Sequence, residues 1–359
     1  MFIPWSKPYL DTKDKLFLNK AFNSSWISGG IYILKLQERL RKIVNRKYAF
    51  ATSNGTSAIH LALLALNLKS NDEIIVPAFG YLAAANISKL MGLKLVFADV
   101  DSKSYCLNLD KIKEKISKKT KAVVIINTYG NLHEIDKIEK FLRKKKIFMI
   151  EDAAESFGSK FQKRQSGSFG DISTFSFHAT KNITTGEGGM VLTNNKTFAK
   201  KIDLYRSHGV KKIRYKHLVH GHNFRLSNLL AAIGYAQSFK INKINKRKVE
   251  MHNLYLKYLN FKKIQTQIFE KNSYVVPWTF PITFKKKLLR DKIYNYLKKK
   301  NIETRKGFFS ADRLQIFKLK KNFKNSNFLS KNIICLPLHL NLKNKDIKFI
   351  SEEVNKFIN

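Results

Sequence analysis

Seven short apolar runs, most of them separated by helical patterns, set the tightest limit on how this chain can fold. The runs are residues 48–52, 73–77, 94–100, 122–129, 147–153, 172–177 and 189–194. Runs that are apolar on both faces are typical of a sheet that helices cover on both sides. Helical patterns such as 56–68 and 133–146 lie between the first five runs, the alternation expected of βαβ units. The sequence therefore predicts an α/β fold with a mostly parallel seven-stranded sheet.

The last two runs depart from that alternation. They are joined by residues 178–188 alone, which is too short for a helical crossover, so at least one strand should be antiparallel. A long helical pattern then covers residues 227–260 and leads outward. The C-terminal residues beyond it contain strand material at 274–284 and 333–340, with helical patterns at 286–301 and 345–358. We expect a large domain over residues 1–244 and a smaller α+β domain over residues 245–359.

Length and composition fit a globular protein of ordinary class. The chain has 359 residues, of which 44% are hydrophobic, enough for a sizeable core. The N-terminal sequence "MFIPWSKPYL" has no basic region followed by an apolar run, and no stretch approaches the roughly 18 apolar residues of a membrane span. We expect a cytoplasmic protein. The two cysteines and nine histidines show no metal-ligand spacing, so no metal site is expected.

The charge balance is strongly basic. With 68 Lys and Arg against 26 Asp and Glu, the net charge is +42, a value often associated with nucleic-acid binding. The basic residues do not form one patch, however, but recur along exposed helix faces at 110–121, 140–146 and 284–301. We expect a solvated surface rather than a nucleic-acid groove, although its field would help to attract a phosphorylated small molecule.

The first strand runs into a candidate anion site. Ligands of open parallel sheets bind beyond the carboxyl ends of the strands, and "SNGTSAIHLALLAL" ends a strand there and begins an apolar helix. The N–H groups of Gly55, Thr56 and Ser57 would point outward with the positive end of the helix dipole, as in a phosphate site. An ordinary N-cap without a ligand uses the same residue types.

The fifth run ends in "IEDAAESFG", which places Asp152 at the same edge of the sheet. A carboxylate there can hold a proton on a ring nitrogen. At about 4 Å and an effective dielectric near 20 it attracts a cation by roughly 4 kcal/mol, or about three pKa units. An N-cap or a metal-binding aspartate would give the same sequence pattern.

Lys181 stands out through its neighbours in "FSFHATKNITTGEGGM". It lies 29 residues after Asp152, among small and hydroxylated residues that let a bulky planar ligand approach the backbone. A desolvated lysine loses its proton easily and becomes the nucleophile that Schiff-base chemistry requires. In a chain so rich in lysine, only this neighbourhood distinguishes it.

Two aromatic residues complete the set. Phe79 and Tyr81 follow the second run, and either could cover a flat ring or belong to the core. A phosphate site, a carboxylate for a ring nitrogen, a nucleophilic lysine and an aromatic cover are together what pyridoxal 5′-phosphate (PLP) requires. The G-x-x-x-x-G-K-[ST] phosphate motif is absent, and "TGEGGM" lacks the dinucleotide-binding spacing.

Nearly the whole chain resembles a known family. The motifs that carry the likeness are "SNGTSAIHLALLAL", "IEDAAESFGSKF", "GSFGDISTFSFHATKNITTGEGGMVLTN", "GHNFRLSN" and "LPLHLNL". In this order and spacing they resemble the nucleotide-sugar aminotransferases of the DegT/StrS group. The resemblance implies a fold-type I PLP enzyme, a homodimer with shared active sites. It also implies glutamate as amino donor, a nucleoside-diphosphate keto sugar as acceptor, and a cofactor that alternates between PLP and its pyridoxamine form (PMP).

The same resemblance assigns roles to residues. Lys181 would hold the cofactor as a Schiff base and act as general acid and base, Asp152 would pair with the ring nitrogen, and Glu155 would lie near the ring's 3′-oxygen. The other cofactor-binding residues would be Gly55, Thr56 and Ser176 at the phosphate with Ser57 in the same turn, Tyr81 on the ring, and Asn223 and Arg225 from the neighbouring subunit.

The version "TKNITTGEGGM" most resembles enzymes that aminate C4 of 4-keto-6-deoxy sugars for surface polysaccharide such as O antigen, with perosamine synthases among the nearest in pattern. Three places depart from the family, namely Gly80, Asn127 and the segment 303–312. We expect the last two to contact the sugar. Two alternatives stay open: amination at C3 or of another keto sugar or cyclitol, and a basic nucleic-acid-binding regulator that kept the fold without the reaction.

Overall fold

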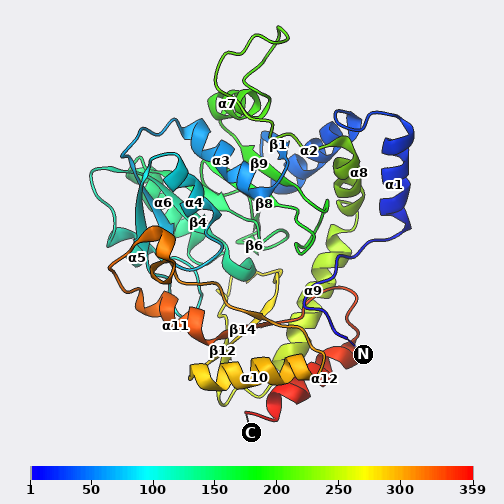
Figure 1. Cartoon of the computed structure of the whole chain (residues 1–359), viewed down its shortest axis with the longest axis vertical. Helices are drawn as coiled ribbons and strands as arrows, with labels where there is room; N and C mark the ends of the chain where they lie inside the picture. The colour runs from blue at the N-terminus through cyan, green and yellow to red at the C-terminus, as the bar shows by residue number, and fades with distance from the viewer. Residues whose placement is uncertain (1, 359) are drawn as a thin grey trace.

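The computed structural model describes residues 2–358 and is built around a seven-stranded sheet (Figure 1). The strand order is β1-β9-β8-β5-β4-β2-β3. The strands are β1 Tyr48–Thr52, β2 Glu73–Pro77, β3 Lys94–Ala98, β4 Thr120–Ile126, β5 Phe148–Asp152, β8 Ile172–Ser176 and β9 Gly189–Thr193. All seven predicted strands are present, and each begins within two residues of its predicted start.

One strand of this sheet is antiparallel to its neighbours. β9 pairs antiparallel with both β1 and β8, whereas the pairs among β8, β5, β4, β2 and β3 are parallel. The prediction of an antiparallel strand near the end of the sheet is confirmed. As a result, Ser176 at the end of β8 lies opposite Gly189 at the start of β9. The carboxyl ends of β1, β2, β4, β5 and β8 therefore share one edge with that start.

Helices cover both faces of the sheet. They are α1 Thr12–Asn23, α2 Ile31–Val44, α3 Gly55–Leu66, α4 Ala83–Leu90, α5 Leu109–Lys113, α6 Ile135–Lys144, α7 Lys196–Arg206 and α8 Asn228–Gln237. In β4, Val124 packs in one buried apolar cluster with Leu61 of α3, while Val123 packs in another with Ile138 of α6. This alternation explains why the strand sequences are apolar at nearly every position.

The long helical pattern predicted for residues 227–260 is divided into two helices, α8 and α9 (Ile241–Tyr258). The break is explained by contacts with α1. Gln237 Nε2 donates to Asp14 Oδ1 at 3.0 Å, and the Lys240 ammonium forms ion pairs with Asp14 and with Asp11 Oδ1, the latter at 3.0 Å. The turn lets both side chains reach the same carboxylate. The predicted domain boundary between residues 244 and 245 falls inside α9 and stays a prediction.

A second, four-stranded antiparallel sheet forms the C-terminal part, in the order β10-β12-β14-β13. Its strands are β10 Ile264–Thr266, β12 Phe280–Phe284, β13 Arg305–Lys306 and β14 Ile333–Leu336, and its helices are α10 Lys287–Lys299, α11 Lys324–Asn332 and α12 Asn344–Asn355. Smaller elements are β6 Lys160–Phe161, β7 Arg164–Gln165, β11 Ser273–Tyr274, η1 Thr128–Gly130, η2 Ala311–Arg313 and η3 Gln315–Phe317.

The N-terminal segment lies against this C-terminal part, where Figure 1 shows both chain ends. Ile3 forms a β-bridge with Ile302 and is buried in the apolar cluster of the C-terminal sheet. Two residues further on, the Trp5 amide donates to Glu303 Oε2 at 3.0 Å. The start of the chain is thereby fixed more than 290 residues away in sequence.

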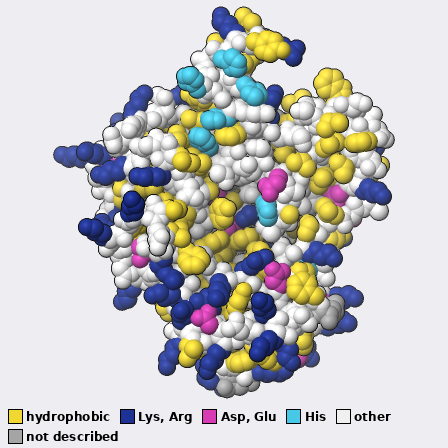
Figure 2. Space-filling view, in the orientation of Figure 1, with side chains coloured by type: hydrophobic (Ala, Val, Ile, Leu, Met, Phe, Trp, Pro, Cys, Tyr) yellow, Lys and Arg dark blue, Asp and Glu magenta, His cyan; other side chains and the backbone are white. Residues whose placement is uncertain are grey.

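The surface carries basic residues over most of the face that Figure 2 shows, more densely towards the C-terminal part, and not as a single stripe. Within residues 2–358, no helix combines the length and the apolar composition needed to cross a bilayer.

Candidate active site

A cavity of about 790 Å³ opens at the carboxyl edge of the large sheet. Its walls include eight of the ten predicted site residues: Gly55, Thr56, Ser57, Tyr81, Asp152, Glu155, Ser176 and Lys181. They come from the ends of β5 and β8, from the start of α3 and from the loops behind β2 and β8. The fold thus brings together side chains that lie more than 100 residues apart in the sequence.

The first turn of α3 forms an anion cradle on one wall. Asn54 caps the helix, and its Oδ1 accepts a hydrogen bond from the Ser57 amide at 2.8 Å. The Ser57 N–H is therefore not free, contrary to the expectation of three open amides. The first intrahelical donor is the Ala58 amide, which donates to the Asn54 carbonyl at 3.1 Å, so the N–H groups of Gly55 and Thr56 come before it and can bind a ligand. A Cβ at residue 55 would lie 2.8 Å from Ser176 Cβ, which shows how closely the cradle approaches the end of β8.

Lys181 lies in a tight turn and lines the same cavity as the cradle. Its amide donates to the His178 carbonyl at 2.9 Å, and its side chain is 13% exposed. Nζ is 3.7 Å from Glu155 Oε1. Burial lowers the pKa of the Lys181 amine below the usual value, while the charges of Glu155 and Asp152 oppose that shift. The site therefore holds an amine that gives up its proton more readily than a surface lysine does.

Two buried carboxyl groups face this amine. Burial raises the pKa of Asp152 to about 6, although a hydrogen bond from the Ala154 amide, 3.1 Å from Oδ1, and the charge of Lys181 act against it. Burial also raises the pKa of Glu155, and Lys181 opposes that shift. Glu155 Oε2 accepts from the Tyr129 amide at 2.8 Å, whereas Oε1 is buried without a hydrogen-bond partner among residues 2–358.

These features fit PLP. Glu155 Oε1 and the buried Thr174 hydroxyl both belong to residues of the cavity wall. Neither has a hydrogen-bond partner among residues 2–358, and a polar ligand in the cavity would supply one. The raised pKa of Asp152 indicates a carboxyl group without a full counter-charge, which a protonated ring nitrogen would provide. No group of three or more His, Cys, Asp or Glu side chains in the described part of the chain is arranged to hold a metal ion.

The two candidate aromatic covers have different environments. Phe79 is fully buried and packs edge-on against Tyr129 and Phe308, at 6.4 and 5.9 Å between ring centroids. Tyr81 is 63% exposed and lies in the cavity wall. Of the two rings, only that of Tyr81 can therefore contact a ligand in the cavity.

Asn223 and Arg225 do not line the cavity of their own chain. Asn223 Oδ1 accepts from Arg225 Nε at 3.2 Å, and the Arg225 guanidinium contacts His208 Nε2 at 3.1 Å. Both residues are exposed, although the Arg225 backbone forms a bridge with Thr52 beside the cradle. They thus lie near the edge of the sheet with exposed side chains.

Asn127 and the segment 303–312 do not line the cavity of the single chain, and their expected contacts with the sugar stay a prediction. Asn127 is 1% exposed and its Nδ2 donates to Glu151 Oε1 at 2.8 Å and Ser156 Oγ at 3.0 Å, beneath the cavity. From the segment 303–312, Phe308 stacks on Tyr129 with 5.4 Å between centroids, and the cavity wall contains none of its residues. In the single chain, the Asn127 amide thus belongs to a buried hydrogen-bond network around Glu151.

The cavity wall also contains residues that the sequence did not single out. Trp5, His60, His178, Glu187 and Trp278 are among them. His178 Nε2 lies 3.6 Å from Glu187 Oε1. The rarity of tryptophan, with three in the chain, was the one signal for Trp5 and Trp278, since both are far from Lys181 in sequence.

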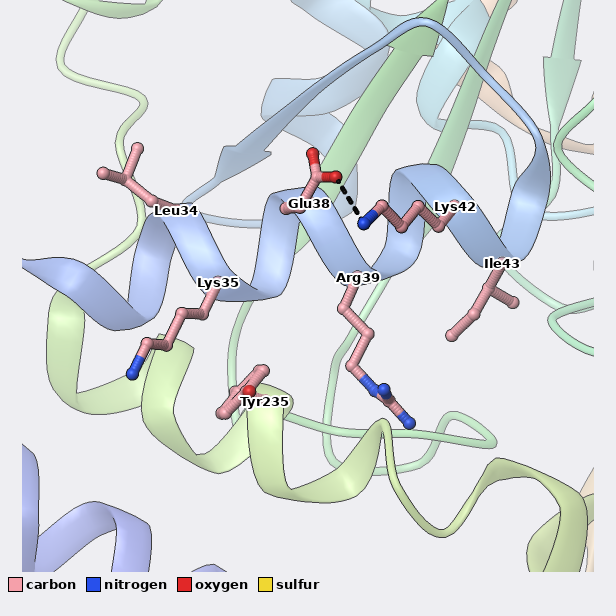
Figure 3. Close-up of a pocket in the computed structure, with 7 residues that line it drawn as sticks. All are labelled: Leu34, Lys35, Glu38, Arg39, Lys42, Ile43 and Tyr235. Carbon is pink, nitrogen blue, oxygen red and sulfur yellow. Dashed lines mark ion pairs between the residues drawn. The ribbon is translucent and has the colours of Figure 1, made fainter.

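A second hollow of about 460 Å³ lies on the outer surface of α2 and α8 (Figure 3). It is lined by Leu34, Lys35, Glu38, Arg39, Lys42, Ile43 and Tyr235. Figure 3 shows the ion pair between Lys42 Nζ and Glu38 Oε1, 3.1 Å apart, on the exposed side of α2. This groove contains none of the predicted site residues, so the cavity around Lys181 is the candidate active site.

Comparison with known proteins agrees with this geometry. GDP-perosamine synthase of Escherichia coli O157:H7 is 36% identical over 359 residues, which cover 99% of this chain and 98% of that protein. The Vibrio cholerae GDP-perosamine synthase is 34% identical and covers 99% of each chain. The PLP form of the putative sugar aminotransferase Spr1654 from Streptococcus pneumoniae has the same fold, with a TM-score of 0.94 at 21% identity over the whole of both chains.

The family match extends from residue 8 to residue 355. Together with the cavity that holds Lys181 and Asp152, this match identifies the chain as a PLP-dependent aminotransferase of the DegT/DnrJ/EryC1/StrS aminotransferase family.

Proposed function

We propose that this enzyme transfers an amino group from glutamate to a nucleotide-linked 4-keto-6-deoxy sugar, as a step in making an amino sugar for surface polysaccharide. The observation that carries the proposal is the cavity in which a buried lysine, two buried carboxyl groups and an anion cradle meet. The similarity to two GDP-perosamine synthases over nearly their full length supports the choice of sugar substrate.

PLP, when bound, supplies an aldehyde that amines can add to and a ring that withdraws electrons from the bond to be broken. Lys181 Nζ would hold the cofactor and would remove and return the proton at Cα of the amino donor. The Asp152 carboxylate would pair with a protonated ring nitrogen, whose charge would favour the ionised carboxylate in this buried site. Glu155 would bind the ring's 3′-oxygen.

The amides of Gly55 and Thr56 and the Ser176 hydroxyl would hold the phosphate group at the cradle, with Ser57 in the same turn. Tyr81 would cover the ring. A helix start binds a phosphate through N–H groups and its dipole, so this part of the site needs no arginine from the same chain.

Two such chains form a homodimer, in which each active site receives Asn223 and Arg225 from the neighbouring subunit. The placement of these residues supports this arrangement, because both side chains are exposed near the edge of the sheet and neither lines the cavity of its own chain. A second copy would therefore supply the Asn223 amide and the Arg225 guanidinium to the cofactor of the neighbouring site.

The test is to incubate the purified protein with glutamate and candidate nucleoside-diphosphate keto sugars, among them GDP-linked ones. We expect 2-oxoglutarate to form in step with an amino sugar whose NMR spectrum places nitrogen at C4. Lys181→Ala serves as the control, which should bind the cofactor without turnover. Nitrogen at C3 would favour the C3-aminotransferase alternative, and absence of 2-oxoglutarate with every keto sugar and cyclitol tested would reject the proposal.

A further inference from the structure

Trp278 lies over the amine of Lys181. The distance from Lys181 Nζ to the centroid of the Trp278 ring is 3.9 Å. The same indole donates from Nε1 to the Thr180 carbonyl at 2.8 Å, and Thr180 is the residue before Lys181. The Trp278 side chain thus contacts the Lys181 amine and also binds the backbone of the residue before it. A ring face at this distance attracts an ammonium group, most strongly where water is excluded.

Lys248 of α9 anchors the backbone of Trp278. Its ammonium donates to the Trp278 carbonyl at 3.0 Å and to the Leu338 carbonyl at 2.8 Å. The residue is 4% exposed, so these two carbonyl oxygens bind an ammonium group that is almost fully removed from water. Burial, and to a smaller extent the charge of Lys181, lowers its pKa to about 7. A buried lysine bound only by carbonyl groups is costly, so its presence here points to a task other than stability.

Trp5 supports the indole from behind. Its ring meets that of Trp278 edge-on, with 5.3 Å between centroids and 90° between planes. Trp5 Nε1 donates to Thr279 Oγ1 at 3.2 Å, which fixes the ring beside residue 278. The N-terminal segment therefore reaches the wall of the active-site cavity.

We propose that Trp278 is a positioning residue for Lys181, and that Lys248 and Trp5 hold its indole over the amine. The inference rests on the proposed role of Lys181 as the cofactor-binding amine. The charged groups that face Lys181 are Asp152 and Glu155 on the β5 side and Lys248 on the α9 side. The carboxyl groups attract the amine from one side, and the ring of Trp278 attracts it from the other. Nζ is therefore held at one place in the cavity.

The experiment measures the protonation of Lys181 in the full-length protein after removal of the cofactor. The rate at which an amine reagent labels Lys181 is followed against pH by peptide mass spectrometry. Trp278→Leu removes the ring but keeps an apolar side chain. We expect the pKa of the Lys181 amine to fall by about 0.5 to 1.5 pH units, since the attraction of the ring for the ammonium is lost. Trp278→Phe should restore part of the shift, and Trp5→Ala should give a smaller shift of the same sign.

Trp26→Phe is the matched control, because Trp26 is 69% exposed and outside the cavity. It should leave the pKa of Lys181 unchanged. An unchanged pKa of Lys181 in Trp278→Leu would mean that the indole does not interact with the amine. A raised pKa would mean that the indole only excludes water from it. Either result overturns the proposal. If Trp278→Leu does not fold, Trp278→Phe serves as the test. The pKa of Lys181 should then fall by a smaller amount, and an unchanged or raised pKa would again overturn the proposal.

The anchor is tested in a protein whose one tryptophan is Trp278, made by Trp5→Phe and Trp26→Phe. Lys248→Met should make the fluorescence of Trp278 several-fold more sensitive to quenching by acrylamide, since the released indole becomes exposed. Lys246→Met, an exposed neighbour on α9, is the control. Equal quenching in the two variants would remove Lys248 from the proposal.

Failure of the proposed function gives a different result. Reduction of the holoenzyme with borohydride fixes the cofactor on whichever lysine holds it, and a peptide other than that of Lys181 would reject the assignment of Lys181 itself. The labelling and quenching results concern the contact between Trp278 and Lys181 and do not depend on that outcome.

Discussion

At Lys181, burial and charge act in opposite directions. Burial lowers the pKa of the amine, whereas Glu155 and Asp152 raise it. The ammonium form is held by the carboxylates and the ring of Trp278, and the neutral form by the apolar surroundings. Such a balance lets one amine serve both as nucleophile and as proton carrier, because neither the neutral amine nor the ammonium is strongly favoured over the other.

Asp152 carries the first prediction. Asp152→Asn should keep the fold and lower the transamination rate by about 1000-fold, because an amide cannot retain the roughly 4 kcal/mol of attraction for a protonated ring nitrogen. Asp171→Asn is the control. Asp171 precedes β8 at the opposite edge of the sheet, where its carboxylate accepts from the Met149 amide at 2.8 Å. Steady-state rates within a few-fold of wild type for Asp152→Asn would mean that another carboxylate has this role.

Lys248 carries a prediction about pH. Its pKa of about 7 in the folded chain lies below the usual value of 10.5. Between these values the unfolded chain binds more protons, so the contribution of Lys248 to stability rises with pH, by at most about 1.4 kcal/mol per pH unit. The free energy of unfolding of wild type, relative to Lys248→Met, should therefore increase from pH 7 towards pH 10 in denaturant titrations.

Lys246→Met again provides the comparison, since residue 246 is exposed. Its free energy of unfolding should follow that of wild type at a constant offset over the same range. Parallel profiles for all three proteins would contradict the low pKa of Lys248.

Single residues were predictable where local sequence determines their place. Asp152 ends β5 and Lys181 lies in the loop after β8, so the carboxyl ends of these parallel strands bring both to one edge of the sheet. Trp278 and Trp5 reach the same cavity through the C-terminal sheet and the N-terminal segment, and no local pattern encodes that meeting. Asn127 shows the reverse case, because a strand-end position did not reveal that its amide binds Glu151 below the cavity.

Among the elements, the start of α3 and the end of β8 form one unit of the site. Gly55 allows them to approach, since an added Cβ would meet Ser176 Cβ at 2.8 Å. Gly55→Ala should weaken PLP binding by about 10- to 100-fold, the loss expected when one hydrogen bond to a charged group is removed. Titration of the cofactor-free protein with PLP, followed by absorbance, measures this change.

Gly29→Ala is the matched control, because a Cβ there would meet nothing within 4 Å. It should bind PLP as wild type does. Equal affinities for Gly55→Ala and wild type would place the phosphate away from the cradle.

Strand and helix positions were predictable to the extent that hydrophobic periodicity is local. All seven strands of the large sheet were found, because buried strands carry nearly continuous apolar runs. The break between α8 and α9 was missed, since it depends on Lys240 reaching Asp14, 226 residues away along the chain. Periodicity cannot register a contact of that separation.

On the scale of the whole molecule, the cavity is closed on one side by the C-terminal part and the N-terminal segment. Trp278 leads into β12 of the smaller sheet, and Trp5 is fixed beside it by Thr279. Asn223 and Arg225 are the predicted site residues that the single chain leaves outside its cavity. The proposed second subunit would complete the site, and this arrangement has a direct consequence for mixtures of variants.

A mixed dimer tests the shared site. A Lys181→Ala homodimer should be inactive, and an Asn223→Ala/Arg225→Ala homodimer should be weakened, since each lost hydrogen bond to a charged group costs about 1.5–3 kcal/mol. In a dimer with one chain of each kind, one site has both lesions. The other site has its own Lys181 and receives intact Asn223 and Arg225 from its partner. Unfolding and refolding the two proteins together should restore about half the wild-type activity per mixed dimer.

Each protein refolded alone should regain only its own level of activity, and two differently tagged copies of the Lys181→Ala chain should show that subunits exchange without restoring turnover. Activity should return only in the mixed dimer, because only this dimer contains a site in which every group is unaltered. If exchange is demonstrated and the mixture never exceeds the sum of its parts, each site lies within one chain. The roles proposed for Asn223 and Arg225 across the dimer would then be wrong, while those of Lys181 and Asp152 would stand on their own tests.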